Sequence, residues 1–194
     1  MGELLSILGK EDFYFAMLRT ATPVLLTTLG AMTASRAGVS NIALEGTMLF
    51  AAFFGVIVSA FSQSALLGFL AAVGIGLLIS LLLSYFILEL HSNGILSGIA
   101  LNTLASGGTI FLLFLITGEK GASTSLHSLK LPALNIPLIE NIPFVGKILS
   151  GQHILTYLSL LLVFVIATLF KKSRLGMEII AVGENPEEAE SLGI

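Results

Sequence analysis

The chain has 194 residues, of which 55% are hydrophobic and 11% are charged, with a formal net charge of −3 and a mean hydropathy of +0.99. Soluble domains carry about 25% charged residues, so this composition indicates an integral membrane protein and argues against soluble enzymes and disordered regulators. The negative net charge argues against nucleic acid as a partner. The chain has no cysteine, which excludes disulfides, thiolate metal sites and cysteine nucleophiles.

Long uncharged segments predict five membrane-spanning helices, because a helix needs about 20 apolar residues to cross the hydrocarbon core. The first span lies between Arg19 and Arg36 and is short. The uncharged run 46–88 is long enough for two spans, which divide at the polar cluster 62–64. The four later spans are expected at 46–61, 65–88, 95–117 and 154–170. These runs are continuous rather than alternating, so we expect an all-α polytopic membrane protein and no β-barrel.

The charges near the spans give a predicted orientation. Residues 119–152 form a predicted loop outside the membrane, since prolines and charged residues interrupt the apolar pattern there. Lys171, Lys172 and Arg174 follow the last span directly, and positive residues gather on the cytoplasmic side of a membrane. With five spans, the N-terminus and the loop 119–152 are then extracellular and residues 171–194 are cytoplasmic. The total of Lys and Arg on the two sides does not favour this orientation, so the dense cluster alone supports it.

The first candidate site is the segment from Arg36 to Gly46, where one span ends, a glycine-containing stretch follows and the next helix begins. Asn41 lies in that stretch and Glu45 opens the next helix. A broken helix with an amide and a carboxylate at its mouth is how many transporters place substrate or gate groups. Two simpler roles stay open for Glu45, which are capping its own helix and pairing with Arg36.

The second candidate site lies on the predicted helix 95–117, where small and polar residues recur at spacings of three and four. Gly98 and Ala105 permit the close approach of another helix, and Ser97 and Asn102 lie beside them. An amide on such a face can bind a polar solute or bond a neighbouring helix. The sequence leaves both roles of Asn102 open.

The end of the chain contains the signals of a short capped helix. Asn185 is a favoured N-cap, and Pro186 suits the first helical position, where its missing N–H costs nothing. Glu188 occupies the third position, as a capping box requires, and Gly193 suits the C-terminal cap. These signals predict a helix over 186–192.

Two apolar residues of this predicted helix, Ala189 and Leu192, give it a small apolar face just beyond the basic end of the last span. A capped helix in that place suits docking of a cytoplasmic partner. The alternative is an ordinary surface turn.

Motifs for catalysis do not occur in the sequence. His91, His127 and His153 have no metal-ligand spacing and no HExxH context, so we expect no metal site and no cofactor in this chain. The phosphate-binding pattern GxxxxGK[ST] is also missing, so any ATP hydrolysis needs a separate subunit. A membrane-embedded enzyme has neither a nucleophile nor a metal constellation to support it.

Three segments resemble, in the same order, three motifs of the permeases of bacterial ABC importers for nucleosides and simple sugars. These permeases belong with the ribose and branched-chain amino acid permease superfamily. Residues 36–46 resemble the first motif, residues 97–102 the second, and residues 174–194 the cytoplasmic loop. Together the motifs cover residues 20–194. Met177 and Glu178 depart from the pattern, because the family commonly has basic or small residues there.

The resemblance implies a single transmembrane permease domain over 1–194, which is the N-terminal part of a longer family domain, in the cell membrane of a bacterium. It implies a separate ABC ATPase subunit, a second and paralogous permease subunit, and an extracellular solute-binding lipoprotein. The expected substrate pathway or gate consists of Asn41, Glu45, Ser97 and Asn102. The expected ATPase-coupling residues are Gly183, Glu184, Asn185, Pro186, Ala189, Leu192 and Gly193.

Rival interpretations stay open beside this resemblance. A secondary transporter or channel would use Glu45 as an ion-coupled group. A branched-chain amino acid ABC permease would share the overall pattern, although the Glu45-Gly46 form of the first motif favours nucleosides or sugars. The sequence does not identify the solute.

Overall fold

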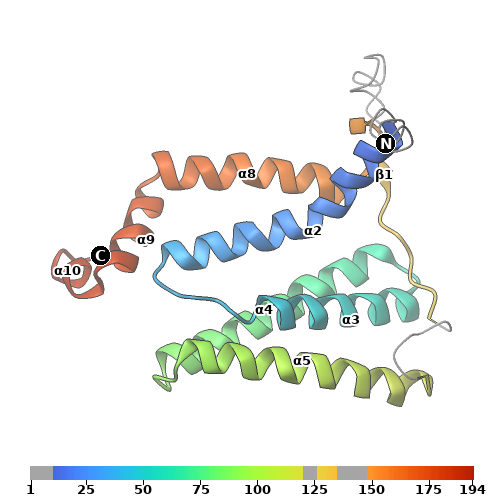
Figure 1. Ribbon diagram of the computed structural model, residues 1–194, viewed down its shortest axis with the longest axis horizontal. Helices are drawn as coiled ribbons and strands as arrows, with labels where there is room; N and C mark the ends of the chain where they lie inside the picture. Colours follow the sequence, from blue (N-terminus) through green and yellow to red (C-terminus); the bar gives the residue numbers. More distant parts are fainter. Residues whose placement is uncertain (1–10, 120–125, 135–147) are drawn as a thin grey trace, which may run out of the picture. The chain divides into compact units, whose positions relative to one another are not determined.

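The structure is a computed structural model that describes residues 11–119, 126–134 and 148–194 (Figure 1). Five helices in these ranges are long and apolar enough to cross a membrane, which confirms the predicted all-α polytopic fold. The helices and strands are α2 (Glu11–Arg36), α3 (Leu44–Ser62), α4 (Ala65–Leu88), α5 (Gly94–Thr117), β1 (Ala133–Leu134), β2 (Gln152–His153), α8 (Ile154–Lys172), α9 (Arg174–Glu184) and α10 (Pro186–Ser191).

The helix limits agree with the sequence except at the first span. The break between the second and third spans falls at Gln63, whose φ is 50°, and the hydroxyl of Ser64 accepts the N–H of Leu67 to cap α4. Helix α2 begins at Glu11, earlier than the uncharged stretch after Arg19 suggests. Charged residues at the end of a spanning helix reach the polar interface, so the helix is longer than its apolar part.

Most of the predicted loop 119–152 lies outside the described residues, namely 120–125 and 135–147. Its described parts include β1 and β2, which pair antiparallel with Ala133 opposite His153 and Leu134 opposite Gln152. The extracellular position of this loop stays a prediction.

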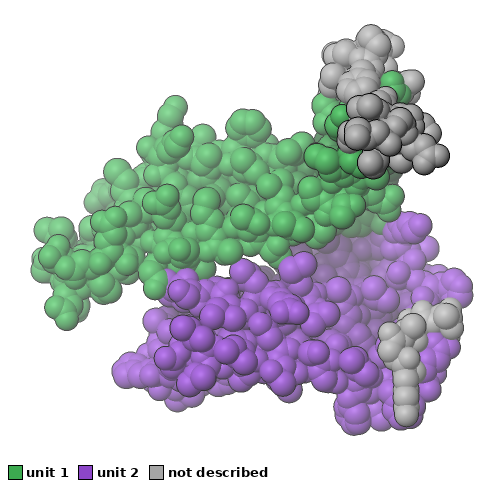
Figure 2. All heavy atoms as spheres, in the orientation of Figure 1, with its two compact units in different colours: residues 1–38, 131–194 green, residues 39–130 purple. Residues whose placement is uncertain are grey.

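The chain divides into two compact units, which Figure 2 shows in different colours. The first unit consists of residues 1–38 and 131–194, and its described helices are α2, α8, α9 and α10. The second unit consists of residues 39–130 and contains α3, α4 and α5. The single permease domain expected from the sequence stays a prediction.

Small residues let α3 and α4 pack closely in the second unit. A Cβ built on Gly68 of α4 would lie 2.6 Å from the Cβ of Ser59 and 2.7 Å from the carbonyl oxygen of Gly55. Gly55 in turn lies against Ala72, so each helix presents two small residues four positions apart. This pattern is typical of helix pairs in membranes, where packing contacts replace the hydrophobic effect as the attraction.

The buried core of the second unit is apolar and joins all three of its helices. It consists of Ala43, Phe50, Ile79, Leu83, Leu101 and Ala105. Outward side chains are also apolar, as shown by Leu81, which is 71% exposed on α4. An apolar outer surface around a small core is what a bilayer environment requires.

The first unit is held together by a polar row between α2 and α8. The hydroxyl of Thr22 donates to the hydroxyl of Thr156 at 3.0 Å, and Ser159, one turn further along α8, is buried. The side-chain nitrogen of Gln152 donates to the carbonyl oxygens of Phe15 and Ile148. Buried polar groups of this kind fix the register of two helices in a medium without water.

Candidate functional site

The side chain of Asn102 joins the first turn of α3 to the middle of α5. Its Oδ1 accepts the N–H of Gly46 at 2.7 Å, and its Nδ2 donates to the carbonyl oxygen of Ile42 at 2.9 Å. The Oδ1 of Asn41 accepts the N–H of Ala43 at 3.1 Å within the same turn. We call this arrangement, formed by residues 41–43, Gly46 and Asn102, the Asn102 clasp.

The clasp supplies a helix cap that the local sequence lacks. Ala43 stands at the N-cap position of α3 and has no side-chain oxygen, so the free N–H groups of the first turn need another acceptor. Asn102 provides that acceptor from a neighbouring helix for Gly46, which is the third residue of α3. In a membrane such a group finds its partner within the protein, because lipid offers none.

Two glycines allow the backbones of this region to approach each other. A Cβ on Gly46 would lie 2.8 Å from Asn102 Oδ1 and 2.9 Å from the carbonyl oxygen of Leu101. A Cβ on Gly98 would lie 3.0 Å from the Cβ of Ile42. A role for Gly46 was not predicted. On α5, Gly98 and Asn102 show the four-residue spacing that marks a close helix contact.

The structure brings two of the four expected pathway residues into the clasp. Asn41 and Asn102 are half-buried, and their side-chain amides form hydrogen bonds with the backbone at the start of α3. This geometry is that of side chains that fix the backbone conformation. Glu45 lies in the first turn of α3 as expected, and it is exposed. Its carboxylate has no side-chain or backbone partner among the described residues of the second unit. Ser97 lies apart from the clasp and its hydroxyl donates to that of Ser92 at 3.4 Å.

The short helix α10 forms as the sequence predicts and is capped at both ends. Asn185 Oδ1 accepts the N–H of Glu188 at 3.4 Å, and Pro186 occupies the first position. At the other end Gly193 has a φ of +75° and donates to the carbonyl oxygen of Glu190, while Ile194 donates to that of Ala189. These two bonds form a Schellman motif, which requires a residue tolerant of positive φ.

Helix α9 precedes α10 and was not predicted. Ser173 caps it by accepting the N–H of Gly176 at 3.0 Å, and Arg174 pairs with Glu178 across one turn at 3.0 Å. A serine followed by apolar residues at helical spacing, Leu175, Ile179 and Val182, is the signal that could have identified it.

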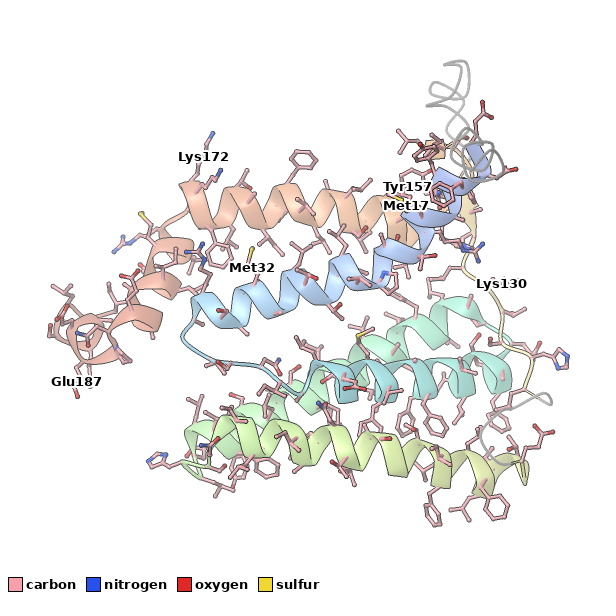
Figure 3. All side chains as sticks on the ribbon, viewed as in Figure 1. Met17, Met32, Lys130, Tyr157, Lys172 and Glu187 are labelled. Carbon is pink, nitrogen blue, oxygen red and sulfur yellow. The ribbon has the colours of Figure 1, made fainter. Side chains whose placement is uncertain are left out.

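Helices α9 and α10 follow the basic end of α8 (Figure 1). Ala189 is buried within the first unit, whereas Leu192 is 77% exposed. Of the two residues of the predicted apolar face, one therefore stabilises the fold and the other remains on the surface. The carboxylates around Leu192 are exposed on α10, and Figure 3 shows Glu187 projecting outward there, with Lys172 at the end of α8. The surface therefore combines one apolar anchor with negative charge.

The five long apolar helices of the described residues and their apolar outer faces together define a multi-pass membrane protein. Residues 13–194 match the family described as the permease component of branched-chain amino acid transport systems. The chain belongs to this family of transport permeases, and the resemblance found in the sequence is confirmed.

Three relatives show the breadth of that family. NupQ of Bacillus subtilis, a guanosine ABC transporter permease protein, is 35% identical over 186 residues, which are 92% of this chain and 58% of NupQ. NupC of Lactococcus lactis, a nucleoside ABC transporter permease protein, is 34% identical over 188 residues, with 92% and 57% covered. TsgC13 of Haloferax volcanii, which its name assigns provisionally to glucose, is 34% identical over 183 residues, with 92% and 54% covered.

The chain thus spans 54% to 58% of the length of these three relatives. No solved structure is significantly similar to the chain.

Proposed function

We propose that this chain serves as the transmembrane permease of an ABC importer for nucleosides or simple sugars in a bacterial cell membrane. The observation that carries the proposal is the pair of helices α9 and α10, which we call the docking helices. They follow a spanning helix with a basic end, and the capped helix α10 exposes an apolar residue, Leu192. The names of NupQ and NupC support nucleosides as the solute. The basic end of α8 supports a cytoplasmic C-terminus and an extracellular N-terminus.

In this proposal the chain performs no covalent chemistry and holds no cofactor. A separate ABC ATPase subunit hydrolyses ATP, a second and paralogous permease completes the pathway, and an extracellular lipoprotein delivers the solute. Closure of the ATPase pair on ATP moves α10 and shifts the spanning helices between outward-open and inward-open states. Residues 184–193 form the proposed ATPase contact.

The chemistry of α10 specifies the partner surface further. Glu184, Glu187, Glu188 and Glu190 are exposed around Leu192. A groove on the ATPase that receives this helix is therefore expected to combine an apolar pocket with Lys and Arg at its rim. Complementary charge of this kind accelerates and orients association more than it raises affinity.

The docking surface is tested by replacing Leu192 with aspartate. We expect the purified permease complex to lose most of its ATPase subunit and its uptake, because the change removes an apolar anchor worth about 2 kcal/mol and adds charge. The control is Leu175→Asp, which makes the same substitution at a residue 65% exposed on the first turn of α9. Co-purification of the ATPase and uptake of labelled nucleoside are measured for both.

Several outcomes of this experiment would contradict the proposal. If Leu192→Asp retains the ATPase as well as Leu175→Asp does, α10 is not the docking element. Uptake that is driven by an ion gradient in vesicles without ATP would indicate a secondary transporter. Competition of uptake by leucine or valine, and not by nucleosides or sugars, would indicate a branched-chain amino acid permease.

The solute pathway is tested at Glu45, an expected pathway residue whose exposed side chain takes no part in the Asn102 clasp. We expect Glu45→Gln to lower uptake by about tenfold, because it removes a charge from the first turn of α3 without removing bulk. The matched control is Glu89→Gln, which makes the same change at an exposed residue of the same unit. Equal uptake kinetics of the two variants would remove Glu45 from the pathway.

A further inference from the structure

The backbone at the end of α2 touches the backbone of α9 at two glycines. A Cβ built on Gly183 would overlap the carbonyl oxygen of Arg36 and would lie 2.8 Å from the nitrogen of Gly38. In the opposite direction, a Cβ on Gly38 would lie 2.9 Å from the carbonyl oxygen of Gly183. Main-chain atoms therefore meet from both sides, and no side chain lies between them that could yield by changing its rotamer.

The two glycines are required for different reasons. Gly38 has a φ of +79°, in the left-handed region that favours glycine, as the chain leaves α2. Gly183 lies in α9, where alanine would be the better helix former by about 1 kcal/mol. Its small size is explained by the contact with α2 and not by the conformation of α9.

The other end of α9 is fixed in the same manner. A Cβ on Gly176 would overlap the carbonyl oxygen of Leu169 at the end of α8. Asn185 connects α9 to α10. Its N–H donates to the carbonyl oxygen of Ala181 in α9, and its side chain caps α10. The docking helices are thus attached by backbone contacts to the ends of both α2 and α8.

Close-packed backbone contacts transmit displacement because they have no slack. A displacement of α9 at Gly183 therefore reaches the end of α2 through its contact with Gly38 and the carbonyl oxygen of Arg36.

We propose that the contact between Gly38 and Gly183 transmits movement of the docking helices to the end of α2. The two glycines are positioning residues for transport, and they take no part in binding solute or ATP. This inference rests on the proposed function, because it assigns a route for the movement that the ATPase would impose on α10.

The test compares two glycine-to-alanine changes in the complete importer, reconstituted with its ATPase, its second permease and its solute-binding protein. Gly183→Ala inserts a methyl group into the contact, whereas the control Gly30→Ala inserts one into α2 at a position with no atom within 4 Å. ATP hydrolysis, ATPase co-purification and nucleoside uptake are measured in proteoliposomes. The informative quantity is the amount of nucleoside transported per ATP hydrolysed.

We expect Gly183→Ala to retain its ATPase subunit and to hydrolyse ATP while transport per ATP falls about tenfold, a typical size for coupling between distant sites. Gly30→Ala should keep the normal ratio. A normal ratio in Gly183→Ala would overturn the inference. Loss of the ATPase subunit from Gly183→Ala would also overturn it, since the contact would then shape the docking surface instead of transmitting its movement.

A second variant decides the matter if Gly183→Ala does not accumulate in the membrane. Gly38→Asn adds a side chain to the contact from the other side, and asparagine tolerates a positive φ better than other residues. For Gly38→Asn as well, a normal transport ratio or loss of the ATPase subunit would overturn the inference. Failure of the proposed function is distinguishable, because the unmodified complex would then show neither ATP-dependent uptake nor a bound ATPase subunit.

Discussion

Replacing Gly68 with valine is expected to separate α3 from α4 and to lower the stability of the protein by about 3 kcal/mol, at the upper end of the cost of overpacking. The Cβ alone would lie 2.6 Å from the Cβ of Ser59 and 2.7 Å from the carbonyl oxygen of Gly55. The second obstacle is backbone, which cannot move aside without displacing the helix. Thermal unfolding of the purified protein in detergent measures the loss.

Gly74→Val is the matched control for this experiment. Gly74 lies in the same helix, and nothing lies within 4 Å of a Cβ built there. The two variants share the change in helix propensity from glycine to valine, so the difference between their unfolding temperatures isolates the packing contact. Similar unfolding temperatures would mean that α3 and α4 do not depend on this close approach.

Replacing Asn102 with alanine is expected to open the clasp. The change leaves the N–H of Gly46 and the carbonyl oxygen of Ile42 without the partner that the side chain provides. A buried polar group left without a partner costs about 1–3 kcal/mol, so the loss of both hydrogen bonds should lower stability by about 2–6 kcal/mol. Thermal unfolding in detergent and nucleoside uptake in vesicles test the two consequences.

The neighbouring residue supplies a control for Asn102. Thr103 lies next to it on α5, and its hydroxyl donates to the carbonyl oxygen of Ile99, one turn back in the same helix. Thr103→Ala should therefore change stability little. If Asn102 bound the solute directly, Asn102→Ala would raise the KM for uptake and leave the unfolding temperature unchanged, which would contradict its role in the clasp.

The helices that cross the membrane could be predicted because each is a long run of one kind of residue. The division at Gln63 followed from a polar cluster within such a run, and α10 followed from caps that act over a few residues. Local signals of this kind depend on neighbours in sequence, which a sequence displays directly.

The contacts between distant residues could not be predicted in the same way. The sequence marked Asn102 as polar and left open whether it binds solute or a helix. Only the position of α3 beside α5 shows that its amide replaces a missing cap. The same holds for Gly183, since nothing in its own segment indicates that the end of α2 lies against it.

The capping of α10 has a consequence for how the exposed surface of this helix can evolve. Asn185, Pro186, Ala189 and Gly193 hold the helix through backbone bonds, fixed dihedral angles and one buried methyl group. The outward positions 187, 190 and 192 contribute little to folding, because substitutions at exposed sites change stability by only about 0.5 kcal/mol. In the proposed importer, mutations at these positions can alter which ATPase is recognised while the membrane-embedded part of the protein stays as it is.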